Sequence, residues 1–170
     1  MKTLLESLEI DLEQLEEEQQ DNGGYEKNDY EELSGYTGEG TELVLPSSIE
    51  DTVMNGVASL AFKDNTKITS VEVPEGMRYI DVSAFEGCTG LKKVTLPDSL
   101  TWIGGYAFSG CTSLETVVFG NQAVEIEGSV FRDCTALRDV ELPASENYLW
   151  DSAFCGAGAG GYIHIGCLLY

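Results

Sequence analysis

A repeat of 23 residues is the feature that most constrains the fold of this chain. Phenylalanine, cysteine, leucine and proline each recur at that spacing, and Gly120 occupies the one open proline position. The four columns are Phe62, Phe85, Phe108, Phe131 and Phe154; Cys88, Cys111 and Cys134; Leu91, Leu114 and Leu137; Pro74, Pro97 and Pro143. Agreement in several columns at once indicates one supersecondary unit that stacks on copies of itself.

The first copy of the repeat is irregular. Pro46 lies 28 residues before Pro74, whereas Phe62 lies 23 residues before Phe85. Five additional residues must therefore fall between Pro46 and Phe62. We expect a loop inserted in an N-terminal, partly capping copy, because terminal repeats are usually atypical.

Within one unit, apolar and polar residues alternate over a short segment. Val94 and Leu96 fall on one side, Thr95 falls on the other, and Pro97 ends the segment, which predicts a short strand. Residues 100–108 supply further inward apolar groups around a Gly-Gly turn. One unit cannot bury its own apolar face, but stacked units can, because equivalent strands then pair about 4.8 Å apart. The repeat therefore predicts a solenoid with a parallel strand sheet.

Residues 91–114 read Leu-Lys-Lys-Val-Thr-Leu-Pro-Asp-Ser-Leu-Thr-Trp-Ile-Gly-Gly-Tyr-Ala-Phe-Ser-Gly-Cys-Thr-Ser-Leu. This motif resembles the BspA-type leucine-rich repeat of bacterial surface proteins, and the resemblance covers residues 29–170. It implies a right-handed coil and recognition of other proteins, as in adhesins. The fourth copy departs from the pattern because it lacks the proline, and the copy at residues 147–154 is weak. Related chains continue beyond the strand at residues 161–165 into a short helix, so we expect an open C-terminal edge here, which could pair with another chain.

The N-terminal part of the chain is acidic. Fourteen carboxylates stand against Lys2 and Lys27 up to Glu42. Leucines at helical spacing after a capping box predict an amphipathic helix over residues 3–20. This helix is a partner-docking or dimerising segment, an end cap on the solenoid, or a frayed acidic tail.

We divide the chain into three parts. Residues 1–24 form the acidic helix or tail, residues 25–42 a linker, and residues 43–170 a solenoid of about five coils.

Charge and hydropathy exclude several classes of partner. With 30 acidic and 9 basic residues the net charge is −21, which repels nucleic acid. No apolar window approaches the length of a membrane span, so membrane insertion is not expected. The first 20 residues also lack the apolar stretch of a signal peptide. The chain is therefore expected to be cytoplasmic if Met1 is the native start, whereas the resemblance implies a secreted or cell-surface protein.

Three features suggest chemistry, but none predicts a catalytic or cofactor site. Column cysteines fall on a line, which cannot give tetrahedral metal ligation, so we expect buried, reduced thiols. Cys155 and Cys167 lie outside the column and could pair or remain free. The letters GxGxxG at residues 156–161 lack the strand and helix that a nucleotide site needs, and His164 is the only histidine. With no nucleophile, base and oxyanion donors together, we expect a protein that is not an enzyme and holds no cofactor or metal.

The outward positions of the predicted strands form the candidate binding site, because such rows are the usual binding surface of repeat proteins. The predicted binding residues are Glu72, Lys93, Thr95, Thr116, Val118, Asp139 and Glu141. We expect a protein partner, which the sequence does not identify. The alternative is a structural module that self-associates weakly through its N-terminal helix or its open C-terminal edge.

Overall fold

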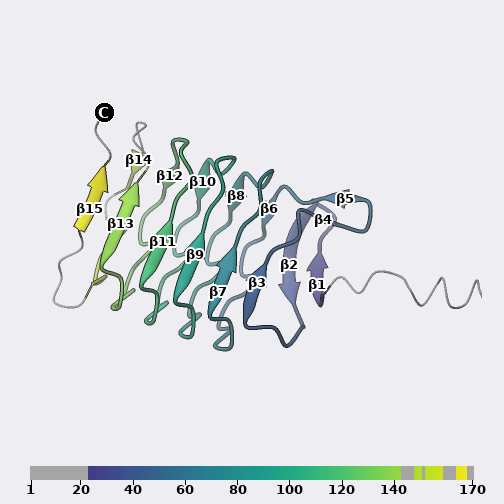
Figure 1. The fold of residues 1–170 in the computed structure, drawn as a ribbon, viewed down its shortest axis with the longest axis horizontal. Coiled ribbons are helices and arrows are strands. Elements are labelled where there is room, and N and C mark those ends of the chain that lie inside the picture. Colours follow the sequence, from purple (N-terminus) through teal and green to yellow (C-terminus); the bar gives the residue numbers. More distant parts are fainter. Residues whose placement is uncertain (1–22, 143–147, 151, 159–163, 168–170) are drawn as a thin grey trace, which may run out of the picture.

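The computed structural model describes residues 23–142, 148–150, 152–158 and 164–167 (Figure 1). These residues form short strands joined by turns, and none of them is helical. The helix predicted over residues 3–20 lies outside the described residues. The strands are β1 (Tyr25–Lys27), β2 (Glu32–Tyr36), β3 (Glu42–Val44), β4 (Ser48–Ile49), β5 (Thr52–Val53), β6 (Gly56–Val57), β7 (Ser70–Glu72), β8 (Tyr79–Ile80), β9 (Lys93–Thr95), β10 (Trp102–Ile103), β11 (Thr116–Val118), β12 (Glu125–Ile126), β13 (Asp139–Leu142), β14 (Tyr148–Leu149) and β15 (His164–Cys167).

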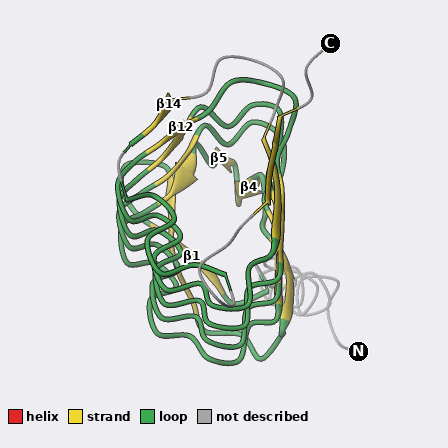
Figure 2. Ribbon diagram, turned by 90° about the vertical axis from the view of Figure 1, so that its left-hand side faces the viewer, coloured by secondary structure: helices red, strands yellow, loops and turns green. Residues whose placement is uncertain are grey.

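Successive coils contribute strands to two main sheets. In the described part of the chain, sheet A has seven strands in the order β1-β2-β6-β8-β10-β12-β14, and sheet B has six in the order β15-β13-β11-β9-β7-β3. Pairing is parallel throughout except between β1 and β2. Viewed along the stack, the two sheets lie on different sides of the coil (Figure 2). The predicted solenoid with parallel strands is confirmed.

The structure differs from the sequence-based expectation in having sheet A. The sequence predicts only that residues 100–108 supply inward apolar groups. The sheet A strands β8, β10, β12 and β14 have two residues each. Two residues are too few to show the alternation that identifies a strand. They pair because the coils above and below hold them in register.

Stacked phenylalanine rings fill the core. Phe108 is fully buried, and its ring centroid lies 5.2 Å from that of Phe85 and 5.6 Å from that of Phe131, with planes within 4° of parallel. The stack continues from Phe85 to Phe62 at 4.7 Å and from Phe131 to Phe154 at 5.1 Å. The predicted inward column is therefore confirmed, and its members contact the same residue of the next coil.

The column cysteines are also buried, and each thiol bonds to the preceding coil. The Sγ of Cys111 donates to the carbonyl of Phe85 at 3.2 Å, and Cys88 and Cys134 make the equivalent bonds at 3.1 Å. All three thiols are free of disulfides. This agrees with the predicted buried thiols, which act as small core side chains with one weak donor.

Two positions in every coil adopt the left-handed backbone conformation. The first column comprises Leu60, Ser83, Tyr106, Ser129 and Ser152, and the second comprises Asp64, Gly87, Gly110, Asp133 and Gly156, with φ between 57° and 73° in every case. Left-handed backbone costs about 1 kcal/mol or more for a residue with a Cβ. Bonds between coils offset this cost, as where the amide of Ser83 donates to the carbonyl of Gly105 at 3.0 Å.

Side chains join the turns that follow sheet B. The carboxylate of Glu75 accepts bonds from the backbone amides of Asp98 at 2.8 Å and Ser99 at 3.2 Å. One coil further, the carboxylate of Asp98 accepts a bond from the amide of Asn121 at 2.7 Å. These bonds satisfy turn amides that no strand reaches and keep the coils in register.

At the N-terminal end, β1 and β2 form an antiparallel hairpin, and β2 pairs with β6. The segment predicted as a linker at residues 25–42 therefore contributes strands to sheet A, and the proposed division at residues 24 and 42 stays a prediction. Strands β4 and β5 form a small hairpin of their own. This hairpin lies between Pro46 and Phe62, where the spacing of the repeat places the five inserted residues.

Candidate binding face

Sheet B carries two columns of strand positions whose described side chains face outward, and we call these columns the sheet B face. The first residues of its strands pair in the order Glu42, Ser70, Lys93, Thr116 and Asp139. Two residues further along each strand, the order is Val44, Glu72, Thr95, Val118 and Glu141. The residue between them in each strand, such as Val94, points inward and is buried.

All seven residues predicted for binding fall in these two columns. Lys93, Glu72, Thr116 and Val118 are exposed, and Thr95 is half-buried. Asp139 and Glu141 pair in register with Thr116 and Val118 on the neighbouring strand, but their side chains lie outside what the structure describes.

A shallow depression of about 260 Å³ lies on this face over β3, β7 and β9. Its outward lining residues are Glu42, Val44, Ser70, Glu72, Lys93 and Thr95. Val44 is 65% exposed at its edge. Within the described residues, neither Glu72 nor Lys93 takes part in an ion pair. The depression therefore presents charges of both signs and one apolar side chain to solvent.

Glu42 and Val44 were absent from the predicted set. They pair directly with Ser70 and Glu72, so they extend both columns by one strand. Their relation to the repeat was hidden because the first copy has an offset of 28 residues in place of 23. The proline spacing between Pro46 and Pro74, taken alone, would have placed them.

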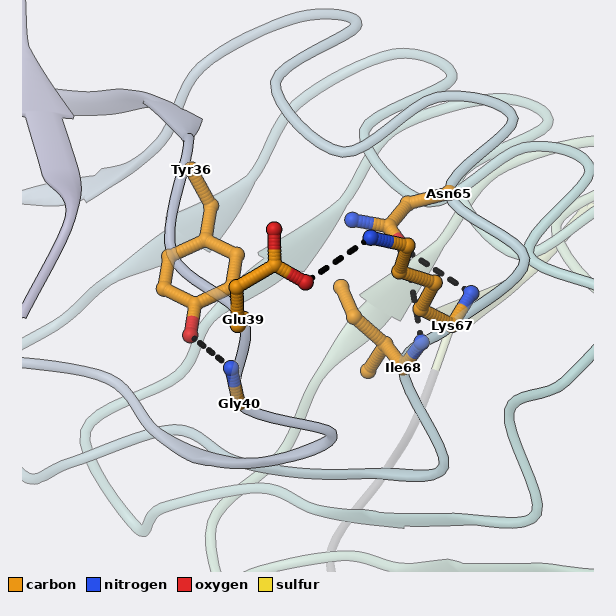
Figure 3. A network of polar contacts seen from close by, with 6 residues as sticks. All are labelled: Tyr36, Glu39, Gly40, Asn65, Lys67 and Ile68. Carbon is orange, nitrogen blue, oxygen red and sulfur yellow. Dashed lines mark hydrogen bonds and ion pairs between the residues drawn. The ribbon is translucent and has the colours of Figure 1, made fainter.

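A second depression, of about 410 Å³, lies where the loop after β2 passes the turn at residues 63–67 (Figure 3). Its polar groups bind one another. The ammonium of Lys67 lies 2.9 Å from the carboxylate of Glu39, and this contact lowers the pKa of Glu39. The hydroxyl of Tyr36 accepts a bond from the amide of Gly40, and the side-chain oxygen of Asn65 accepts bonds from two backbone amides. This network holds the N-terminal loop in place, so these polar residues have a structural role.

Two of the buried thiols, those of Cys88 and Cys111, have raised pKa values. Burial raises the pKa of Cys88 to about 12. The adjacent Cys134 thiol, followed by burial, raises the pKa of Cys111 far above its ordinary range. A thiol that stays protonated is a poor nucleophile and a poor metal ligand. In contrast, Cys155 is exposed.

Metal-ligand clusters and membrane-spanning helices are both missing from the described residues. No group of three or more His, Cys, Asp or Glu side chains there could hold a metal ion. No helix within those ranges is long and apolar enough to cross a membrane.

Comparison with known proteins identifies the repeat. A family model described as the BspA type leucine rich repeat region matches residues 55–166 in six copies. The comparison with curated proteins gives no match.

Solved structures of bacterial proteins share the fold. A leucine rich repeat protein of T. pallidum is 35% identical with a TM-score of 0.67, over 77% of this chain and 63% of that one. A leucine rich cell surface protein of Faecalibacterium prausnitzii is 22% identical with a TM-score of 0.63, over 85% of this chain and 41% of that one. A leucine-rich repeat protein of Bacteroides capillosus is 23% identical with a TM-score of 0.51, over 85% of this chain and 95% of that one.

The chain thus spans less than two thirds of the length of the first two of these proteins. The family model covers well over half of the chain, and the coils of the structure carry the columns of its motif. The chain belongs to the BspA-type leucine-rich repeat family.

Proposed function

We propose that this chain is a non-catalytic module that binds another protein through the sheet B face. The observation that carries the proposal is the depression over β3, β7 and β9, where Glu72 and Lys93 are exposed without an ion-pair partner among the described residues. Exposed charges of both signs beside an exposed valine suit a partner with complementary charges, because such complementarity fixes orientation and excludes wrong partners.

The relatives support a role outside the cell. The protein of F. prausnitzii is described as a cell surface protein, and this chain shares its fold. Repeat proteins commonly bind partners along an extended surface built from equivalent positions. These two points support an adhesin-like or scaffolding role with a protein partner.

Partner capture with matched charge variants tests the proposal. Proteins captured by the wild-type chain from cell surfaces and lysates are compared with those captured by Glu72→Lys, Lys93→Glu and a Glu115→Lys control. Glu115 is exposed but lies outside the two columns. We expect one specific partner to be lost with both face variants and kept with the control. A partner retained by all three variants would show that another surface binds it.

A second candidate function is self-association through the C-terminal end of the stack. Strands β14 and β15 are the outermost strands of their sheets in the described part of the chain. Leu149 beside this end is 42% exposed. Outermost strands present unpaired backbone groups, which a second chain can pair with.

Sedimentation equilibrium over a range of concentrations tests this candidate. We expect Leu149→Lys to weaken association, because it places a charge at the edge. The control is Val53→Lys, since Val53 is 62% exposed in the hairpin at the opposite end. A monomer at every concentration would refute the candidate.

A further inference from the structure

Sheet A carries a second exposed face, which is rich in aromatic residues. The side chains of Tyr79 and Trp102 project outward from β8 and β10, and their ring centroids lie 6.4 Å apart. Trp150 follows β14 and is 58% exposed. We call these three rings the aromatic face. They include both tryptophans of the chain.

Two glycines let the rings lie against the sheet. A Cβ at Gly56 would lie 2.5 Å from a ring carbon of Tyr79, and a Cβ at Gly104 would lie 2.9 Å from a ring carbon of Trp102. Neither glycine has a positive φ. A Cβ would also meet backbone of the neighbouring coil, 2.7 Å from the carbonyl oxygen of Tyr79 at Gly56 and 2.8 Å from the amide nitrogen of Val82 at Gly104, so the rings and that backbone together exclude a side chain. The rings therefore rest on the backbone and present an outer surface.

A carboxylate holds the polar group of each ring. The hydroxyl of Tyr79 donates to Glu32 at 2.8 Å, the indole N–H of Trp102 donates to Glu127 at 3.2 Å, and that of Trp150 donates to Glu125 at 3.1 Å. The second oxygen of Glu127 accepts the amide of Gly105 at 2.8 Å. These bonds fix the rings in place.

The charge of these carboxylates is not compensated within the described residues. Glu32, Glu125 and Glu127 form no ion pair there, and the same holds for Asp81 between them. The neighbouring base, Arg78, is exposed and forms no ion pair either. Burial, followed by the bond to Glu32 and the nearby carboxylates, raises the pKa of Tyr79 to about 12, as expected on a negatively charged surface.

We propose that the aromatic face binds an extended, arginine-bearing segment of a protein partner. A guanidinium group stacks on aromatic rings and pairs with carboxylates, so this face offers both of its preferred contacts side by side. Alternate side chains of an extended peptide are about 6.6 Å apart, close to the 6.4 Å between the rings of Tyr79 and Trp102. An Arg-x-Arg segment can therefore place one guanidinium over each ring.

This proposal is independent of binding through the sheet B face, because the two sheets lie on different sides of the coil (Figure 2). Either face can fail its test without affecting the other. Charge complementarity selects the occupant, since a neutral saccharide can donate hydrogen bonds to the carboxylates but cannot neutralise their charge.

Intrinsic tryptophan fluorescence tests the proposal, because both tryptophans of the chain belong to the aromatic face. The full chain is titrated with a synthetic Arg-Ser-Arg-Ser-Arg peptide at low and at physiological ionic strength. The same sequence with citrulline in place of arginine is the uncharged control, and a neutral oligosaccharide is a further probe. We expect saturable quenching by the arginine peptide that weakens with salt.

Matched variants locate the binding. Glu125→Gln with Glu127→Gln removes two charges but keeps side-chain acceptors for both indoles, and we expect about fivefold weaker binding. Glu115→Gln combined with Glu72→Gln removes the same charge from sheet B, and we expect a change of less than about twofold. Circular dichroism confirms that each variant is folded.

The proposal is overturned by any of three results. The arginine peptide could fail to quench, or the two double variants could weaken binding equally, which would indicate non-specific attraction to an acidic chain. A neutral oligosaccharide that quenches independently of salt would identify a carbohydrate surface.

Discussion

Replacing Phe108 with alanine removes the middle ring of the core stack. The ring is fully buried and lies between parallel rings 5.2 Å and 5.6 Å away. Strand β9 of the same coil pairs with β7 and β11 of the two neighbouring coils, so these backbone bonds hold the coils apart and the cavity cannot close. We therefore expect a loss of about 3 to 5 kcal/mol, the range for a buried phenylalanine whose site does not collapse.

Urea unfolding followed by circular dichroism measures this loss, and thermal unfolding should show a decrease in Tm of about 10 °C for a chain of this size. Phe154→Ala is the internal comparison. Phe154 is only half-buried and stacks on Phe131 at one end of the column, so we expect about half the effect. Thr112→Ala, at an exposed turn, is the surface control. A Phe108→Ala effect no larger than that of the control would refute the assigned register.

Three further predictions concern the thiols and the turns. In the native protein, iodoacetamide should modify the exposed Cys155 quickly and the column cysteines slowly. Peptide mapping by mass spectrometry measures both rates, and fast modification of the column cysteines would contradict their burial. The pKa of Cys88 rises from 9.0 to about 12 on folding, so between these pH values the folded state keeps a proton that the unfolded state loses. The free energy of unfolding should therefore fall between pH 9 and 12, by about 1.4 kcal/mol per pH unit for this thiol. A Cys88→Ala variant with an unchanged pH slope in urea titrations would exclude this cause. Gly110→Ala should lower the free energy of unfolding by about 1 kcal/mol in a thermal unfolding assay, from the backbone alone, because the new Cβ meets nothing closer than 3.8 Å. Gly87→Ala should lower it further, since its Cβ would collide with the Asp64 carboxylate. Equal losses for the two variants would contradict that collision.

The repeat predicts the core better than it predicts the surface. The phenylalanine and cysteine columns lie inward because a side chain at one position of the unit must stack on its copies, and this holds for any sequence with that spacing. Sheet A was not predicted because its two-residue strands carry no alternation of their own. The column that links Tyr79, Trp102 and Glu125 at 23-residue spacing is visible in the sequence, but only the structure shows that it faces outward.

The candidate sites also include features that the sequence predicts and features that only the structure shows. The rows of the sheet B face follow from strand alternation, so all the predicted binding residues fall in them, although their role in binding stays a proposal. The depression beside Val44 depends on the irregular first copy, and the bonds between indoles and carboxylates depend on side-chain geometry. The periodicity of the sequence alone predicts neither the depression nor these hydrogen bonds.

The near-parallel planes of the stacked phenylalanines, between 4° and 6° for the three inner contacts, mean that each coil is almost a pure translation of the one before it. Tandem duplication or loss of one 23-residue unit would then lengthen or shorten both outer faces while keeping every remaining contact. A change of any other length must be accommodated in a loop, as the five additional residues between Pro46 and Phe62 are, because otherwise it would turn inward side chains outward. Evolution can therefore change the length of the surface that contacts a partner in steps of about 4.8 Å, one step for each coil, without changing the core.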